Sequence, residues 1–555
     1  MDKTRWHRSY PPYVPREISL DDHETLNSML ERSFARYAER TVATCLGEML
    51  TYADLNRLST YFAAFLQQSG LTKGDRVALV LPNGLPFLVA MTATLRAGFI
   101  VAAVNPLYTP RELAQQLSDS GAACVVVAEA FLPILREALP QPTIRRIVIA
   151  PPVGLREVAR RLDSSAANAT LVSRGASPGQ ELEIDLAAAL EAGRQVPIDA
   201  TKVEPTDISF LQYTSGTTGV SKGAMLTQRS MAASVSQILA GYRTLLEGGA
   251  PSVVTPLPLY HIYPLAMTFA AICIGMKNRL IVDPRDVQTV VGEMCREPFE
   301  MFLGVNTLFN SLASAADFGE IDFSRTRLVF GAGAPVQDAV ARRWSEAGGP
   351  AITECYGLTE ASPTVSLNPP GSSGTIGLPA PSTDVRIVNA QGQEVELGEA
   401  GELLVKGPQT FAGYWNRADA THEAFTSDGW LRTGDVVSMT ADGYMHLVDR
   451  KKDLILVSGF NVYPNEIETV VMMLPDVHEC ACVGVADERT GEAPCLYVVP
   501  KCADVTVEQI MIHCRKNLAA YKIPRHISMV TSLPKSAVGK ILRKDLRQQH
   551  ESRLR

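Results

Sequence analysis

The sequence predicts an α/β protein in which a large amino-terminal domain is followed by a small carboxy-terminal one. Between residues 51 and 130, stretches with helical spacing alternate with short apolar runs, as in parallel sheets buried on both faces. After residue 370 the strands become short or alternating and are bounded by turns, which indicates a β subdomain. Beyond residue 450, strands around one helix indicate a separate α+β domain of about a hundred residues.

Length and composition are those of an ordinary soluble enzyme. The chain has 555 residues, 46% apolar and 20% charged, which is enough for about two to four domains. The net charge of −7 gives no sign of a nucleic-acid partner, and a solvated helix explains the basic stretch 535–555 equally well. The ten cysteines include no Cys-x-x-Cys pair, so we expect reduced thiols in a cytoplasmic protein.

Neither a secretory signal nor a membrane span is expected. The charged amino terminus, followed by Pro11 and Pro12, lacks the apolar core of a signal. The most apolar stretch, residues 87–104, is interrupted by Arg96 and Gly98, which favours a buried helix followed by a buried strand. Peripheral contact with the inner face of the membrane and a homodimer stay open.

The elements follow in order along the chain. Three helix–strand pairs are expected first: residues 52–68 with 77–81, 86–96 with 100–104, and 111–118 with 124–127. Residues 151–194 suit helices and surface loops. Thr227 is placed to cap a helix ending near residue 239, and helices are also expected at 265–276 and, after Pro335, at 336–346. The β subdomain and the small domain contain strands 385–388, 401–406, 444–448, 454–457, 481–485 and 496–499 and a helix at 464–473.

The stretch on which the chain is centred, residues 213–223, reads YTSGTTGVSKG between two apolar runs, so a strand, a tight turn and a strand are expected. Gly216 and Gly219 let backbone N–H groups converge on an anion, and Lys222 adds a charge. Further donors are the hydroxyls of Thr214, Ser215, Thr217 and Thr218. Ser221 stands where a Walker A loop has glycine, so this is a different phosphate loop. A flexible polar hairpin stays open as the alternative.

Other stretches suit a site less strongly. Residues 329–335 form a strand ending in small residues, which lets another group approach the backbone closely. His261 lies among apolar residues and is more typical of a satisfied core histidine. The charged stretch 428–453 is, by itself, more typical of a solvated turn. Near the carboxy terminus, Lys540 follows a glycine.

Together, five of these stretches resemble the adenylate-forming family, which includes acyl-CoA synthetases, firefly luciferase and the adenylation domains of peptide synthetases. They are residues 213–219 with Lys222, 356–360, 433–435, 449–450 and 539–540, in the order found in that family. The resemblance covers nearly the whole chain. Residues 428–452 are similar to the signature of fatty acyl-CoA synthetases, and 105–111 and 457–464 to bacterial long-chain enzymes. Departures at Ser215, Ala332, Ala334 and Arg432 bear on acyl-chain length rather than on adenylation.

The resemblance implies an AMP-forming ligase for medium- to long-chain fatty acids that uses ATP, Mg²⁺ and coenzyme A. A carboxylate attacks the α-phosphate of ATP to give an acyl-adenylate, and the CoA thiol then displaces AMP. Two alternatives are a ligase that loads a carrier protein and a non-catalytic sensor of AMP or acyl-CoA. Retention of Lys222, Glu360, Asp435 and Lys540 argues against the sensor.

The resemblance also assigns residues to roles. Residues 214–222 would hold the β- and γ-phosphates, Thr359 the α-phosphate, and Glu360 with Thr214 the Mg²⁺. Tyr356 and Gly357 would meet adenine, beside the backbone of Gly331, Ala332, Gly333, Ala334 and Pro335. Asp435 and Arg450 would bind the ribose, and His261 would lie near the carboxylate.

Two domains, residues 1–450 and 451–555, would be joined by a hinge at Lys452. Rotation of the second, mobile domain would bring Lys540 to the site for adenylation. It would then bring Ser458 and Gly459 to the pantetheine tunnel for thioester formation.

Overall fold

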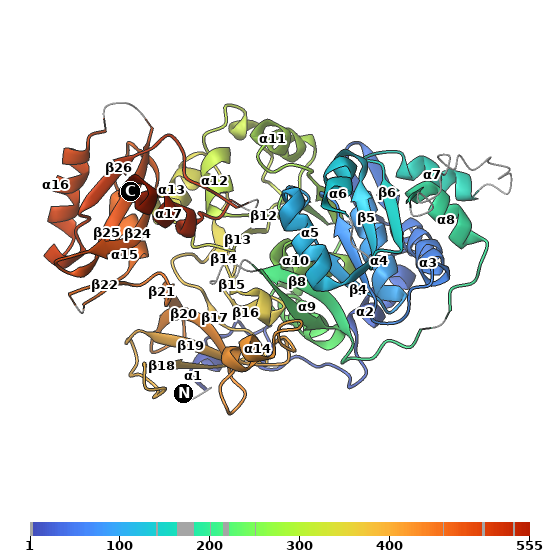
Figure 1. Ribbon diagram of the computed structural model, residues 1–555, viewed down its shortest axis with the longest axis horizontal. Coiled ribbons are helices and arrows are strands. Elements are labelled where there is room, and N and C mark those ends of the chain that lie inside the picture. Colours follow the sequence, from blue (N-terminus) through green and yellow to red (C-terminus); the bar gives the residue numbers. More distant parts are fainter. Residues whose placement is uncertain are drawn as a thin grey trace.

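The computed structural model describes residues 4–139, 143–163, 183–199, 201–214, 221–249, 251–458, 460–501, 505–536 and 539–554. It is a mixed α/β structure with a large amino-terminal part and a small carboxy-terminal part, which lie side by side in Figure 1. The predicted fold class is confirmed.

A first seven-stranded sheet has the order β7-β6-β5-β3-β4-β8-β9 and is parallel except for the antiparallel pair β8–β9. Its strands are β3 (Arg76–Val80), β4 (Ile100–Ala103), β5 (Ala122–Ala128), β6 (Arg146–Ala150), β7 (Glu183–Asp185), β8 (Ile208–Thr214) and β9 (Lys222–Thr227). Every residue of β5 is buried, as its uninterrupted apolar sequence predicts.

A second seven-stranded sheet has the order β14-β13-β12-β10-β11-β1-β2 and is parallel except for the antiparallel pair β1–β2. Its strands are β1 (Thr41–Cys45), β2 (Glu48–Thr51), β10 (Ser252–Thr255), β11 (Lys277–Leu280), β12 (Met301–Gly304), β13 (Leu328–Gly331) and β14 (Ile352–Glu354). The carboxyl ends of β13 and β14 lead into residues expected to bind nucleotide.

Helix α4 (Leu85–Arg96) contacts β3 and β4 of the first sheet and β1 of the second, so it lies between the two sheets. All of its residues before Arg96 are buried, which confirms the buried helix expected for the most apolar stretch. No helix in the described part of the chain is long and apolar enough to cross a membrane. The other helices of the large part's α/β region are α1 (Thr4–Ser9), α2 (Leu26–Tyr37), α3 (Tyr52–Gln68), α5 (Pro110–Ser120), α6 (Leu132–Ala138), α7 (Leu155–Asp163), α8 (Leu186–Arg194), α9 (Gln228–Leu246), α10 (Ile262–Cys273), α11 (Val287–Arg296), α12 (Asn306–Leu312) and α13 (Asp338–Glu346).

Three helix predictions need correction. Thr227 caps α9 as expected, but the helix runs on to Leu246. Helix α10 begins directly after His261, earlier than predicted. Helix α13 begins at Asp338 rather than after Pro335, because the N–H of Val336 is bonded to a carboxylate instead of entering the helix. Strand β7 was not predicted, and residues 164–182 lie outside the described part.

The β subdomain is a four-stranded antiparallel meander of β18 (Asp384–Val388), β19 (Gly401–Lys406), β20 (Leu431–Met439) and β21 (Met445–Arg450). Helix α14 (Ala418–Ala424) contacts β20, and a small sheet of β15 (Tyr356–Gly357), β16 (Thr364–Leu367) and β17 (Leu378–Pro379) lies in the chain just before it. The charged stretch 428–453 is not a solvated turn as expected, because Asp435 and Asp449 are buried in β20 and β21.

We call the carboxy-terminal part the cap. Strands β22 (Ile455–Val457), β23 (Phe460–Val462), β24 (Val477–Asp487) and β25 (Gly491–Pro500) form its antiparallel sheet, and β26 (His526–Met529) adds in parallel to β25. Helices α15 (Pro464–Met472), α16 (Val507–Asn517) and α17 (Arg543–Leu554) accompany them. Figure 1 shows α17 on the side of the cap that faces the large part.

Candidate active site

The antiparallel register of β20 and β21 places Asp435 opposite Arg450. Arg450 Nε lies 3.3 Å from Asp435 Oδ1, and Tyr356 Oη donates to Asp435 Oδ2 at 2.5 Å. Burial and the charge of Asp435 raise the pKa of Tyr356 well above its usual value, so the phenol stays a donor. Gly357 allows close passage of the chain, because a Cβ there would lie 2.1 Å from Pro363 O. Residues expected at adenine and ribose are thus joined directly.

The segment after β13 is pinned by a buried carboxylate that the sequence did not single out. Glu354 accepts hydrogen bonds from the N–H groups of Val336 (3.0 Å) and Gly374 (2.7 Å). Burial raises its pKa. At Gly331 the close neighbours are the chain's own Val336 and Ile352, since a Cβ would lie 2.7 and 2.9 Å from their Cγ2 atoms.

The next residues of this segment are open to a ligand. Gly333 is exposed with φ at 82°, a conformation that favours glycine, and Pro335 is also exposed. Ala334 is half-buried and Ala332 is buried. The backbone of residues 333–335 is therefore the part that can lie beside a nucleotide.

The strands of the expected phosphate hairpin are present, with Thr214 paired to Lys222. Ser221 Oγ donates to Thr214 O at 2.8 Å and closes the base of the hairpin. Ser215, Gly216, Thr217, Thr218 and Gly219 lie outside the described residues.

Tyr213, the first residue of the motif, is anchored from outside the hairpin. Its hydroxyl donates to Asp119 Oδ2 at 2.8 Å, and Arg417 Nη2 lies 2.5 Å from Asp119 Oδ1. Asp119 belongs to α5 and Arg417 precedes α14. The hairpin is therefore tied both to the first sheet's helix layer and to the β subdomain.

Glu360 lies in a short 3-10 turn (Thr359–Ala361), where Tyr414 Oη donates to its Oε1 at 2.6 Å. Among the described residues, no group of three histidine, cysteine or acidic side chains gathers as a metal site. One or two carboxylates are enough to hold Mg²⁺, which completes its shell with water and phosphate oxygens. Glu360, whose Oε1 accepts from Tyr414, is the carboxylate expected to hold it.

Lys540 is carried from the cap into this site. Its pKa is lowered to about 7 by burial and then by the charge of Arg450, with Asp435 acting in the opposite direction. The Gly539 carbonyl next to it accepts from Thr307 Oγ1 of α12 at 3.3 Å, which fixes the loop on the large part. Lys540 therefore lies with Asp435 and Arg450.

His261, at the amino end of α10, joins the same group. Burial and the nearby charge of Lys540 lower its pKa to about 4, so the imidazole is neutral near pH 7. A neutral ring can orient a carboxylate by hydrogen bonding without adding charge.

We expect docking of the nucleotide-free cap to depend on pH. The docked Lys540 has a pKa of about 7, whereas a free lysine has one of about 10.5, so the docked form binds the proton more weakly. Docking should be insensitive to pH below about 7 and strengthen as pH rises toward 10.5. Energy transfer between labels on cysteines introduced at exposed Leu107 and Ile512 would measure this. Lys540→Met should abolish the dependence; a parent enzyme whose docking weakens with rising pH would contradict it.

Lys452 is exposed in the turn between β21 and β22, with buried Asp449 and Asp453 on either side of it. Arg543 of α17 lies 3.6 Å from Asp449, 3.5 Å from Asp453 and 2.8 Å from Glu468. Helix α17 is therefore bound to both sides of the turn, and is more than the solvated helix that was one explanation of its basic sequence.

Ser458 is not brought to the other site residues. It is exposed, and its N–H bonds within the cap to Thr490 O at 2.8 Å. Gly459 lies outside the described residues.

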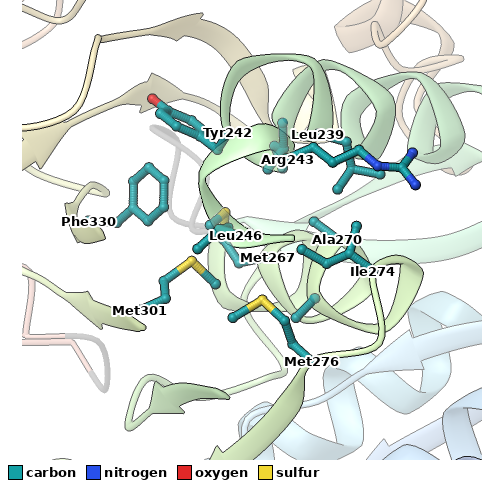
Figure 2. A pocket seen from close by; sticks show the side chains of 12 residues that line it. Leu239, Tyr242, Arg243, Leu246, Met267, Ala270, Ile274, Met276, Met301 and Phe330 are labelled. Carbon is teal, nitrogen blue, oxygen red and sulfur yellow. The ribbon is translucent and has the colours of Figure 1, made fainter. Parts of the chain in front are cut away.

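A small apolar cavity lies between α9 and α10 and reaches Met301 of β12 and Phe330 of β13 (Figure 2). It has room for about one water molecule, so in this structure it is too small for an acyl chain. Its lining includes Tyr242 and Leu246 of α9, Met267, Ala270 and Ile274 of α10, and Phe330 of β13. Tyr242 Oη lies 3.3 Å from the Sγ atom of Cys355, the residue before Tyr356 in the chain.

Three groups of site residues were missed by sequence reasoning: Glu354, the Asp119–Arg417 pair and Tyr414. Glu354 precedes a recognised motif, but burial of its carboxylate has no local signal. Asp119 and Arg417 are 298 residues apart. Tyr414 belongs to an aromatic, glycine-containing run, residues 411–415, which is the only hint the sequence offers.

Two family models match this chain. The family model described as AMP-binding enzyme matches residues 30–415, and that of the AMP-binding enzyme C-terminal domain matches residues 466–540. A long-chain-fatty-acid–CoA ligase of Yersinia pestis is 46% identical over 98% of this chain and 97% of its own.

Solved structures agree with these matches. The anthranilate CoA ligase AuaEII in complex with anthranoyl-AMP has a TM-score of 0.82 at 25% identity, covering 96% of this chain and 98% of that one. ATP-bound MatB from Rhodopseudomonas palustris has a TM-score of 0.81 at 27% identity, covering 95% and 99%.

Proposed function

Because this chain belongs to the AMP-binding enzyme family, we propose that it joins medium- to long-chain fatty acids to coenzyme A, with ATP converted to AMP and pyrophosphate. The observation that carries the proposal is that Tyr356 and Arg450 both contact the carboxylate of Asp435, whose charge also acts on Lys540 of the cap. This chain is 46% identical to a ligase named for long-chain fatty acids, which supports the same substrate class.

In the first half-reaction, the chain's residues bind and orient two anionic substrates. Asp435 and Arg450 hold the ribose, Tyr356 lies against adenine, and Thr359 and the hairpin hold the phosphates. A carboxylate oxygen of the fatty acid attacks the α-phosphorus, and the bond to pyrophosphate breaks. Lys540 neutralises charge that builds on the α-phosphate and the carboxylate, since bound phosphate favours its protonated form.

Neutral His261 orients the carboxylate. Mg²⁺, held by Glu360 with Thr214 beside it, would supply charge neutralisation on the phosphates. Lys222 adds a second fixed cation on that side. Catalysis of this kind comes mainly from positioning and preorganised charge.

For the second half-reaction we propose that the cap, residues 451–555, rotates about Lys452 against residues 1–450. The exposed turn between β21 and β22 supports this position for the hinge. Rotation would withdraw Lys540 and present Ser458 and Gly459 to the pantetheine arm. The CoA thiol then attacks the acyl carbonyl and AMP leaves.

A ligase that loads a carrier protein is the principal alternative, and a CoA thioester product separates the two. A sensor without catalysis would show no fatty-acid-dependent exchange of pyrophosphate into ATP. The same proposal includes a cytoplasmic protein that can form homodimers and contact the inner face of the membrane. Sedimentation would test the dimer, and cell fractionation would test the membrane contact.

We expect kcat/KM to rise with acyl-chain length until the part of the site that receives the acyl chain is full. Each buried methylene contributes roughly 0.8 kcal/mol, or up to about fourfold in kcat/KM. AMP release with CoA over carboxylates from acetate to oleate would measure this. A preference for acetate or for aromatic acids would contradict the proposed substrate class.

A further inference from the structure

Residues 411–415 form a short strand-like segment against β9. Backbone bonds run from Met225 N to Gly413 O and from Ala412 N to Met225 O, each at 2.9 Å, and Ala224 bridges Tyr414. The hairpin strand that begins at Lys222 is therefore paired on both edges. This pairing fixes the backbone of Tyr414 relative to the phosphate hairpin.

Tyr414 stands between the two charged groups expected at the triphosphate. Its hydroxyl donates to Glu360 Oε1 at 2.6 Å, and the ammonium of Lys222 lies 5.2 Å from the centre of its ring. Phe411 reinforces the arrangement, because its N–H donates to Glu360 O at 2.9 Å and its ring packs edge-on to Tyr414 with the centres 4.9 Å apart.

The two charged groups make separate contacts with this one side chain. Among the described residues, no ion pair joins Glu360 to Lys222. Direct pairing of the Glu360 carboxylate with the Lys222 ammonium would lower their electrostatic energy. Each group would then be less available to a metal or a phosphate. The tyrosine ring lies against the cation while its hydroxyl occupies one carboxylate oxygen.

We propose that Tyr414 is a positioning residue for adenylation: its hydroxyl aims the second oxygen of Glu360 at the cation of MgATP, and its ring keeps Lys222 beside the phosphates and apart from Glu360. The proposal rests on the proposed function for the site it serves.

Two substitutions separate the two contributions. Tyr414→Phe removes only the hydroxyl, whereas Tyr414→Ala also removes the ring and lets Glu360 pair with Lys222. Tyr444→Phe is the matched control, because it removes a phenol from the β20–β21 turn of the same subdomain. Thermal unfolding of all three reports any general loss of stability.

Calorimetry with a non-hydrolysable ATP analogue, with and without Mg²⁺, and with AMP measures binding without turnover. Tyr414→Phe should weaken analogue binding about tenfold in Mg²⁺, with little change for metal-free analogue or AMP, because one hydrogen bond to a charged group is lost. It should also raise the Mg²⁺ concentration for half-maximal pyrophosphate exchange by a similar factor. Tyr414→Ala should in addition weaken metal-free analogue binding by about two- to fivefold through Lys222.

Unchanged Mg²⁺ dependence in Tyr414→Phe would overturn the proposal, as would an equal loss of affinity for AMP and MgATP analogue, which indicates a structural role alone. The binding measurements stand apart from the reaction. If the parent enzyme showed no pyrophosphate exchange with any fatty acid, the proposed function would fail, while the calorimetry would still decide the role of Tyr414.

Discussion

Replacing Lys540 by alanine should slow acyl-adenylate formation by at least about 10²- to 10³-fold, the usual cost of removing one preorganised charge donor at a transition state. Lys540 lies among Asp435, Arg450 and His261, at the place where the attacking carboxylate and the α-phosphate would meet. Single-turnover formation of adenylate from ATP and a fatty acid measures the effect.

The same variant should make thioester from synthetic acyl-AMP and CoA at close to the parent rate, since the rotated cap no longer presents Lys540. Lys544→Ala is the matched control, because Lys544 is exposed on α17 four residues further along the chain. Equal losses in both half-reactions would indicate one fixed cap arrangement or a folding defect. Survival of both would mean that the ammonium of Lys540 takes no part in either half-reaction.

Asp435→Ala should cost on the order of 2 to 4 kcal/mol in the adenylation step. The carboxylate is expected to accept two ribose hydroxyls, and it also accepts the hydroxyl of Tyr356 and pairs with Arg450. Its removal therefore loosens the adenine side as well as the ribose. Both the KM for ATP and kcat should worsen in steady-state kinetics.

Asp442→Ala provides the comparison, since Asp442 is an exposed acid in the turn of the same β20–β21 hairpin. Asp435→Asn should fall between the two, because an amide keeps one acceptor oxygen. An ATP KM and turnover unchanged by Asp435→Ala would show that the nucleotide lies elsewhere.

Several elements of the large part that are continuously buried were predicted, although β10 and β12, whose residues are all buried, were not. Uninterrupted apolar runs specified strands such as β5, and the helix α4 between the sheets was expected from the composition of residues 87–104. Helix capping was also predictable from the local sequence, since Thr227 is the N-cap of α9 as expected. Such features depend on neighbours in sequence, which is the information that a sequence provides directly.

What escaped prediction depends on partners far apart in the chain. Asp449 looks solvated among charged neighbours, yet it is buried against Arg543, 94 residues later. The start of α13 shifted because the carboxylate of Glu354 takes the N–H of Val336. Tyr414 acquires its place through Glu360, 54 residues earlier. None of these pairings alters hydrophobic spacing or turn composition.

The ion pairs of Arg543 with acidic residues on both sides of Lys452 bear on how the cap could rotate. Glu468 and Asp453 follow Lys452 in the chain and would travel with the cap, whereas Asp449 precedes it and stays behind. Asp449 also accepts the N–H of Asn465 from the cap, at 2.9 Å. The proposed rotation of the cap about Lys452 would therefore separate buried Asp449 from two partners at once. Its activation barrier would then include the hydration of Asp449, so these contacts would hold the cap in the docked arrangement rather than leave it free to rotate.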